Sequence, residues 1–106
     1  MRVRYTEAAR NDLRSIYLQG EDMFGARQAN AYAAGLHRAI LLAADYPLAS
    51  RLRVDLAQSV RAKRYKAHVI VYTVDEAGML VLRLRHGHED WLHETDGPDP
   101  DRSDDP

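Results

Sequence analysis

The chain has 106 residues and contains 15 Lys and Arg against 16 Asp and Glu, so its length is that of one ordinary domain. It contains no cysteine, which excludes a disulfide framework, a thiolate metal site and cysteine catalysis. No apolar run approaches the roughly 20 residues of a membrane span, and the charged N-terminus is not a signal peptide. We expect a cytoplasmic protein that does not contact membranes.

The near-neutral total charge conceals an asymmetry along the chain. Residues 1–88 hold 14 Lys and Arg and 8 Asp and Glu, whereas residues 89–106 hold one Arg and 8 Asp and Glu. A basic body favours an acidic or polyanionic partner. The alternative is that the charge serves only solubility.

Periodic patterns predict a short strand and then two helices. Arg2-Val3-Arg4-Tyr5 alternates as a strand does, Thr6 can cap the first helix, and Gly25 can end it. The second helix stops before Pro47. Since the connection is so short, we expect an antiparallel hairpin. The apolar faces are formed by Ala9, Leu13, Ile16, Tyr17, Gly20 and Phe24 and by Ala29, Ala33, Leu36, Ile40 and Ala43.

The second half of the chain predicts a loop and three strands. Pro47 to Ala57 is expected to be a loop and Val60 to Tyr65 a strand. Residues 68–86 predict a hairpin that turns at residues 75–78, where Gly78 can adopt a positive φ. In its second strand, Leu80, Leu82 and Leu84 should face one way and Val81, Arg83 and Arg85 the other.

The last residues have the composition of a disordered tail. Residues 95–106 contain three Pro and no large apolar side chain, so they cannot bury enough surface to become ordered. We therefore divide the chain into a folded domain of residues 1–94 and an acidic tail of residues 95–106. Because the helices precede most of the strands, the fold class should be α+β, with the helical hairpin packed on a small antiparallel sheet.

Basic residues on the predicted strands are the first candidate site. If the faces of their strands coincide, they form a cationic surface suited to phosphate or to an acidic peptide. The alternative is that these residues only form the solvated side of a half-buried sheet. The residues are Arg61, Lys63, Arg64, Lys66, Arg83 and Arg85.

Histidines at the end of the last strand are the second candidate. His86 and His88 could share a strand face and bind a metal, but Gly87 should break the strand and no third ligand has clear spacing, so we expect no metal and no cofactor. A histidine beside a phosphate-binding arginine could instead act as a general acid. Six tyrosines could include a base-stacking platform, although packing in or beside the core is the favoured explanation.

Taken together, residues 1–92 resemble the RelE/ParE superfamily of toxin–antitoxin toxins, most closely its ParE branch. The segments that carry the resemblance are YTEAARNDL at 5–13, FG at 24–25 with Ala29 and Tyr32, YP at 46–47, HVIVY at 68–72 and LRLRHGHEDW at 82–91. ParE-like chains commonly have Arg after the His-Gly pair, where this chain has His88.

The resemblance implies an α-helical hairpin on a small antiparallel sheet and a toxin neutralised by a ParD-like antitoxin, in a hetero-oligomer. It also implies that DNA gyrase is the target and that the protein binds rather than catalyses. The alternative is a RelE-like ribosome-dependent mRNA endonuclease, whose site would use Arg83, Arg85, His86 and His88. For binding the antitoxin or the target, the candidates are Arg61, Arg64, Arg83, Arg85 and Trp91.

Overall fold

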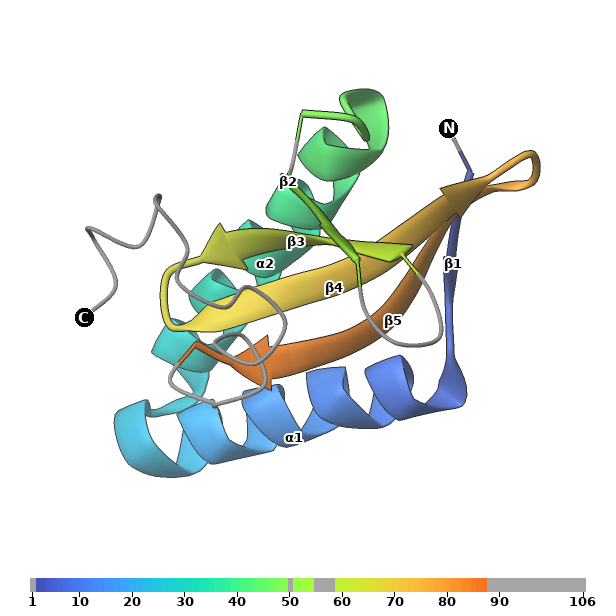
Figure 1. Ribbon diagram of the computed structural model, residues 1–106. Helices are drawn as coiled ribbons and strands as arrows, with labels where there is room; N and C mark the ends of the chain where they lie inside the picture. The colour runs from blue at the N-terminus through green and yellow to red at the C-terminus, as the bar shows by residue number, and fades with distance from the viewer. Residues whose placement is uncertain (1, 50, 55–58, 88–106) are drawn as a thin grey trace.

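The computed structural model describes residues 2–49, 51–54 and 59–87. Within this part of the chain, two consecutive helices follow the first strand, and the five strands join one sheet in the order β1-β5-β4-β3-β2 (Figure 1). The elements are β1 (Val3–Tyr5), α1 (Glu7–Phe24), α2 (Ala26–Asp45), β2 (Arg51–Val54), β3 (Ser59–Tyr65), β4 (His68–Asp75) and β5 (Gly78–His86).

The predicted α+β class and the N-terminal helical hairpin are confirmed, with two differences in the sheet. First, β1 pairs with β5 in parallel, so the sheet is mixed and not wholly antiparallel. Second, Arg51–Val54, expected to be part of a loop, forms strand β2 and pairs antiparallel with β3. Strand β2 lies at the end of the sheet and has only four residues, which is too short for a clear alternating pattern.

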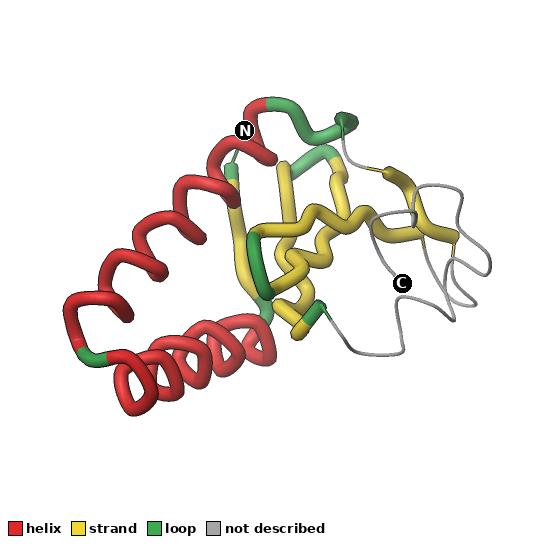
Figure 2. The backbone as a smooth tube through the Cα atoms, turned by 90° about the vertical axis from the view of Figure 1, so that its left-hand side faces the viewer, coloured by secondary structure: helices red, strands yellow, loops and turns green. Residues whose placement is uncertain are grey.

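The helix boundaries follow the predicted capping residues. The Thr6 hydroxyl accepts a hydrogen bond from the Ala9 backbone N–H at 2.9 Å, which caps α1. Gly25 has a φ of 93°, a value that favours glycine, and it separates α1 from α2. Figure 2 shows that the two helices diverge from this short connection toward the sheet.

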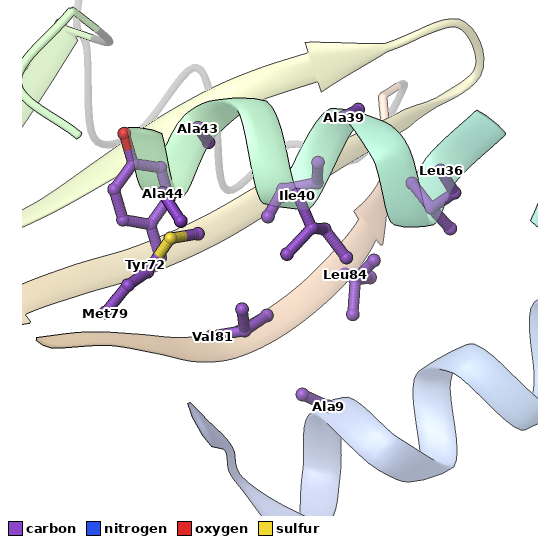
Figure 3. Packing of buried hydrophobic residues seen from close by; sticks show 11 residues of the cluster. Ala9, Leu36, Ala39, Ile40, Ala43, Ala44, Tyr72, Met79, Val81 and Leu84 are labelled. Atoms are coloured by element: carbon purple, nitrogen blue, oxygen red, sulfur yellow. The ribbon is translucent and has the colours of Figure 1, made fainter. Parts of the chain in front are cut away.

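The main core lies between α2 and the centre of the sheet (Figure 3). Leu36 and Ile40 of α2 are fully buried, as are Tyr72, Met79 and Val81 of the sheet. Ala9 adds a contact from α1, and small residues of α2 allow the helix to approach the sheet closely. Packing therefore explains Tyr72, and Tyr5, Tyr32 and Tyr65 also pack against this cluster while partly buried.

A β-bulge in β5 overturns the alternation expected from the sequence. Val71 pairs with Arg83 but Tyr72 pairs with Val81, so Leu82 is the extra residue. As a result, Leu84 packs in the main core while Leu82 packs on the opposite face. Val81 also lies in the main core, contrary to the expectation that it shares a face with Arg83. A bulge shifts the face of every later side chain, and strand periodicity does not reveal it.

Helix α1 is fixed along β5 by three residue-specific contacts. The Thr6 backbone N–H donates to the Val81 carbonyl at 3.0 Å, and the Thr6 hydroxyl donates to the Leu82 carbonyl at 2.7 Å. Further along the helix, the Asp12 carboxylate accepts from the Leu84 backbone N–H at 2.9 Å. These bonds satisfy backbone groups of β5 in addition to those that pair with β1.

Candidate functional site

A groove of about 660 Å³ lies between the two helices and the adjoining ends of β4 and β5. Its walls are mostly apolar, and they include Leu13, Ile16 and Leu36. At the outer end of α1, Met23 and Phe24 line the groove, and each is 62% exposed. Phe24 therefore extends the apolar face of α1 as expected from its spacing, but it contributes to a surface and not to the core.

Close packing at two glycines sets the shape of this groove. A Cβ on Gly20 would lie 3.8 Å from the Ala29 Cβ, so the helices approach closely near their connection. On the other side of α2, Gly35 lies directly against the Tyr65 hydroxyl, where a Cβ would overlap that oxygen. Because α2 is drawn toward the sheet while α1 follows β5, the helices separate and leave the groove between them.

A cluster of Tyr32, His68 and His86 lies at the sheet end of the groove. The Tyr32 hydroxyl lies 2.7 Å from His68 Nδ1. The His68 ring meets the His86 ring edge to face, with centroids 5.5 Å apart. These side chains share the helix-facing side of the sheet, since His68 and His86 are directly paired across β4 and β5.

Burial tunes the acid–base behaviour of this cluster. Desolvation, with a smaller contribution from the neighbouring His86, lowers the pKa of His68 below its usual 6.5. Desolvation also raises the pKa of Tyr32. At neutral pH, His68 is therefore an uncharged hydrogen-bonding partner for Tyr32, which suits an apolar groove.

Among the predicted arginines, Arg83 is engaged within the molecule. Its Nε and Nη2 donate to the two oxygens of Asp12 at 2.7 and 3.1 Å. Burial acts to raise the pKa of Asp12, but hydrogen bonds from Arg83 and Leu84 and the charges of Arg83 and Arg85 outweigh it, so the pKa of Asp12 is lowered. Arg83 thus joins β5 to α1.

The remaining arginines are divided between the two faces of the sheet. Arg64 and Arg85 are both paired with Val69, so the three side chains form a row on the face turned away from the helices. Arg61 is paired with Tyr72 and so lies on the helix-facing side. Lys63, paired with Ile70, shares that side. The faces of these strands therefore do not all coincide, which was the condition for a single cationic surface.

The set proposed for RNA cleavage is divided in the same way. Arg83 and Arg85 are paired with Val71 and Val69 on the face opposite the main core, from which Arg83 reaches Asp12 of α1, whereas His86 belongs to the groove side. His88 and Trp91 lie outside the described residues. Within residues 2–49, 51–54 and 59–87, no group of three or more potential ligands could hold a metal ion, and no described helix is long and apolar enough to cross a membrane.

The sequence of the chain matches a known protein family. Residues 3–91 match the family described as "ParE toxin of type II toxin-antitoxin system, parDE". The chain belongs to the ParE toxin family. The predicted resemblance is thereby confirmed, and the match ends at Trp91, three residues before the predicted end of the folded domain.

A solved structure supports the fold of this ParE-family chain. The structure described as "Chromosomal ParDE TA system from P. aeruginosa" is similar with a TM-score of 0.68 at 18% sequence identity. The alignment covers 81% of this chain and 95% of the other. No curated protein sequence is significantly similar to the chain.

The sequence predicted a binding site at the arginines, which stays a prediction, and it gave no indication of the groove. The available signal was the apolar spacing of both helices, which extends to Met23 and Phe24. What the spacing could not show is that the helices diverge, so that part of each apolar stripe lines the groove and has no packing partner among the described residues.

Proposed function

We propose that this ParE-family toxin inhibits DNA gyrase by binding and is neutralised in the cytoplasm by a ParD-like antitoxin. The observation that carries the proposal is the family match, which spans residues 3–91. The solved structure of similar fold is described as a ParDE system, which supports an antitoxin as the partner.

The groove between α1 and α2 is the surface we assign to the antitoxin. An amphipathic helix is the occupant, because a groove between two helices accepts the apolar face of a third. Met23 and Phe24 supply exposed apolar area at the rim. Basic residues dominate the body of the toxin, so an antitoxin with acidic residues beside its apolar face would complement both properties.

The positions of the candidate nuclease residues favour binding over catalysis. A phosphate clamp and a general acid must act on the same reacting group, within hydrogen-bond reach. In the described part of the chain, His86 lies on the groove side, whereas Arg83 and Arg85 belong to the opposite face. Arg83 is also bound to Asp12.

Two assays with the purified toxin separate gyrase inhibition from RNA cleavage. In the first, toxin is mixed with gyrase and supercoiled plasmid; in the second, with translating ribosomes and message. We expect trapped, cleaved DNA and intact message. Codon-phased cuts in the message that disappear in His88→Ala, with gyrase unaffected, would instead establish the nuclease alternative.

The groove assignment is tested with the antitoxin candidate encoded by the reading frame next to the toxin gene. Met23→Glu places a charge in the apolar groove at an exposed position, so the fold should persist while antitoxin affinity falls by more than about tenfold, or 1.4 kcal/mol. Leu42→Glu is the matched control, because Leu42 is an exposed leucine of α2 outside the groove. Equal affinities of both variants, measured by calorimetry, would reject the groove as the binding site.

A further inference from the structure

The groove between α1 and α2 is lined by histidines but, among the described residues, by no side chain with a permanent charge. None of the described residues that line it is Lys, Arg, Asp or Glu. Three are histidines, namely His37 and the directly paired His68 and His86. Imidazole is the side chain whose charge ordinarily changes between pH 5 and 8. Any charge that this lining acquires near neutral pH therefore comes from its histidines and is positive.

The hydrogen bonds around His68 suit both of its protonation states. The Tyr32 hydroxyl lies 2.7 Å from His68 Nδ1 and 3.3 Å from the Tyr65 carbonyl oxygen. When Nδ1 of a neutral His68 is unprotonated, the hydroxyl donates to it. When His68 is protonated, Nδ1–H donates to the Tyr32 oxygen and the hydroxyl turns to the Tyr65 carbonyl. Rotation of one hydroxyl group therefore keeps a partner for Nδ1 and for Tyr32 in both states.

The described lining provides no carboxylate to balance a charged imidazole. Desolvation and the neighbouring His86, whose ring centroid lies 5.5 Å away, lower the pKa of His68 in the chain without a partner. The titratable side chains that line the groove are all tyrosines and histidines. They are Tyr5 of β1, Tyr17 of α1, Tyr32 and His37 of α2, His68 of β4 and His86 of β5. A negative counter-charge in the groove therefore has to arrive with the occupant.

Positive charges lie around the sheet end of the groove, at the turn between β3 and β4. Lys66 of this turn places its Nζ 5.6 Å from the centre of the Tyr65 ring. Arg64 donates to the Lys66 carbonyl at 3.2 Å and to the Gly87 carbonyl at 3.4 Å, which holds its guanidinium between the turn and the end of β5. These charges favour an anionic group of a partner at this end of the groove and disfavour a cationic one.

We propose that the helix bound in the groove presents a carboxylate to the pair of His68 and His86, and that this pair takes up a proton from solvent on binding. The inference rests on the proposed function, because it takes the groove as the antitoxin site. It adds the chemistry of the partner, which is an amphipathic helix with an aspartate or glutamate at the end that meets the sheet. The two titrations are coupled, so the proton belongs to the pair.

The consequence of this arrangement is an antitoxin affinity that depends on pH. A carboxylate beside an imidazole favours the charged imidazole and raises its pKa. The complex therefore holds more protons than the separate proteins at pH values between the pKa of the pair without antitoxin and its pKa in the complex. By linkage, affinity should rise as pH falls from about 7.5 to about 6, by at most about tenfold per pH unit for one proton.

Proton uptake on binding is measured by calorimetry of the full-length toxin with the antitoxin candidate from the neighbouring reading frame. Titrations in buffers of different ionisation enthalpy count the protons, and we expect uptake of up to about one proton near pH 6.5. Binding that takes up no proton, or that weakens on acidification, would overturn the inference and leave the antitoxin partner in place. Absence of any binding would overturn the proposed antitoxin partner and this inference with it.

Histidine variants of the toxin locate the proton. The double variant His68→Gln, His86→Gln should bind without proton uptake, because amides do not titrate in this range. His37→Gln is the matched control, since His37 lines the same groove from α2, and it should retain the uptake. Loss of uptake in His37→Gln, or its persistence in the double variant, would overturn the assignment to the pair.

Nuclear magnetic resonance of the unmodified toxin gives the same information without dependence on the folding of a variant. The imidazole C–H signals of His68 and His86 should titrate at a higher pH in the complex than in the toxin alone, and an unchanged titration would overturn the proposal. On the partner, each acidic residue of the amphipathic segment is replaced in turn by its amide. One replacement should abolish the proton uptake, and uptake that survives every replacement would overturn the assignment to a carboxylate.

Discussion

At the scale of single residues, Asp12 connects helix and sheet in two ways. Its carboxylate binds the Arg83 guanidinium in a bidentate manner and also accepts from the Leu84 backbone. A carboxylate that accepts both kinds of bond is held in one position, and it satisfies the Leu84 backbone N–H of β5. Arg83 therefore has a structural role, so a charge reversal there would disturb the fold together with any binding surface.

Asp12→Ala should lower the free energy of unfolding by about 1–2 kcal/mol. The change leaves the Leu84 N–H and Arg83 without their acceptor, and the loss stays modest because Arg83 is partly exposed. Asp22→Ala is the control, since Asp22 is an exposed carboxylate of the same helix; it should shift stability by less than about 0.5 kcal/mol. Urea titrations measure both, and equal losses would show that the Asp12 contacts add nothing.

The partial burial of His68, with a smaller contribution from His86, makes stability depend on pH near neutrality. The pKa of His68 is lower in the folded chain than its usual 6.5 in the unfolded chain. At pH values between the two pKa values, the unfolded chain therefore binds more protons than the folded chain. By linkage, stability must fall as pH falls from about 7 through that range. Two titratable groups face the His68 ring, namely Tyr32 from α2 and His86 from β5. Tyr32 in turn packs on Tyr65 of β3.

His68→Gln should reduce this loss of stability on acidification. The measurement is the difference in urea midpoint between pH 7 and pH 5.5 for wild type and variant. His37→Gln, at an exposed histidine of α2, should retain the wild-type difference. If His37→Gln removed as much of the pH dependence as His68→Gln, the cluster of Tyr32, His68 and His86 would not be its source.

At the scale of elements, the contact between α2 and β3 depends on the absence of a side chain at Gly35. A Cβ there would overlap the Tyr65 hydroxyl and lie 2.9 Å from the ring carbon Cζ. The same helix would otherwise gain from alanine, which exceeds glycine in helix propensity by about 1 kcal/mol. At position 35, helix propensity therefore favours alanine while the close contact with Tyr65 opposes it, and the contact should have the larger effect on stability.

We expect Gly35→Ala to destabilise the protein by about 1–3 kcal/mol through overpacking. Tyr65→Phe removes the overlapping oxygen and should recover part of that loss in the double variant. Gly20→Ala is the control in α1, because its Cβ would meet the Ala29 Cβ at an ordinary 3.8 Å, and it should be neutral or stabilising. Thermal melts compare the three variants; a stabilised Gly35→Ala would mean that α2 shifts freely on the sheet.

Local signals in the sequence were sufficient for the helices but not for the details of the sheet. Thr6 caps α1 and Gly25 ends it as predicted, because capping depends on residues close in sequence. The bulge at Leu82 and the parallel pairing of β1 with β5 depend on contacts between distant segments. The sequence indicated the arginines as a candidate site. Their division between two faces depends on how the strands pair, which the sequence of one strand alone does not show.

At the scale of the whole molecule, the predicted boundary at residue 94 separates the apolar part of the C-terminal segment from its acidic end. A chain that ends at Glu94 should melt within about 2 °C of the full-length chain, because the removed residues include no large apolar side chain that could contribute to a core. A chain that ends at Gly87 lacks Trp91 and Leu92 and should melt at a distinctly lower temperature. Calorimetry of the two shortened chains checks the boundary, and a large drop for the longer one would show that the acidic end stabilises the fold.

The attachment of α1 along β5 also determines how this sheet can grow. The backbone groups of residues 81, 82 and 84 that a neighbouring strand would need are already bonded to Thr6 and Asp12. Open sheet edges recruit strands from other chains, in recognition and in aggregation alike. Here the part of β5 that extends beyond β1 is closed from within, so a partner strand cannot pair there and is left with the two end strands of the described sheet, β1 and β2. The start of the helical hairpin is the element that closes this stretch of β5.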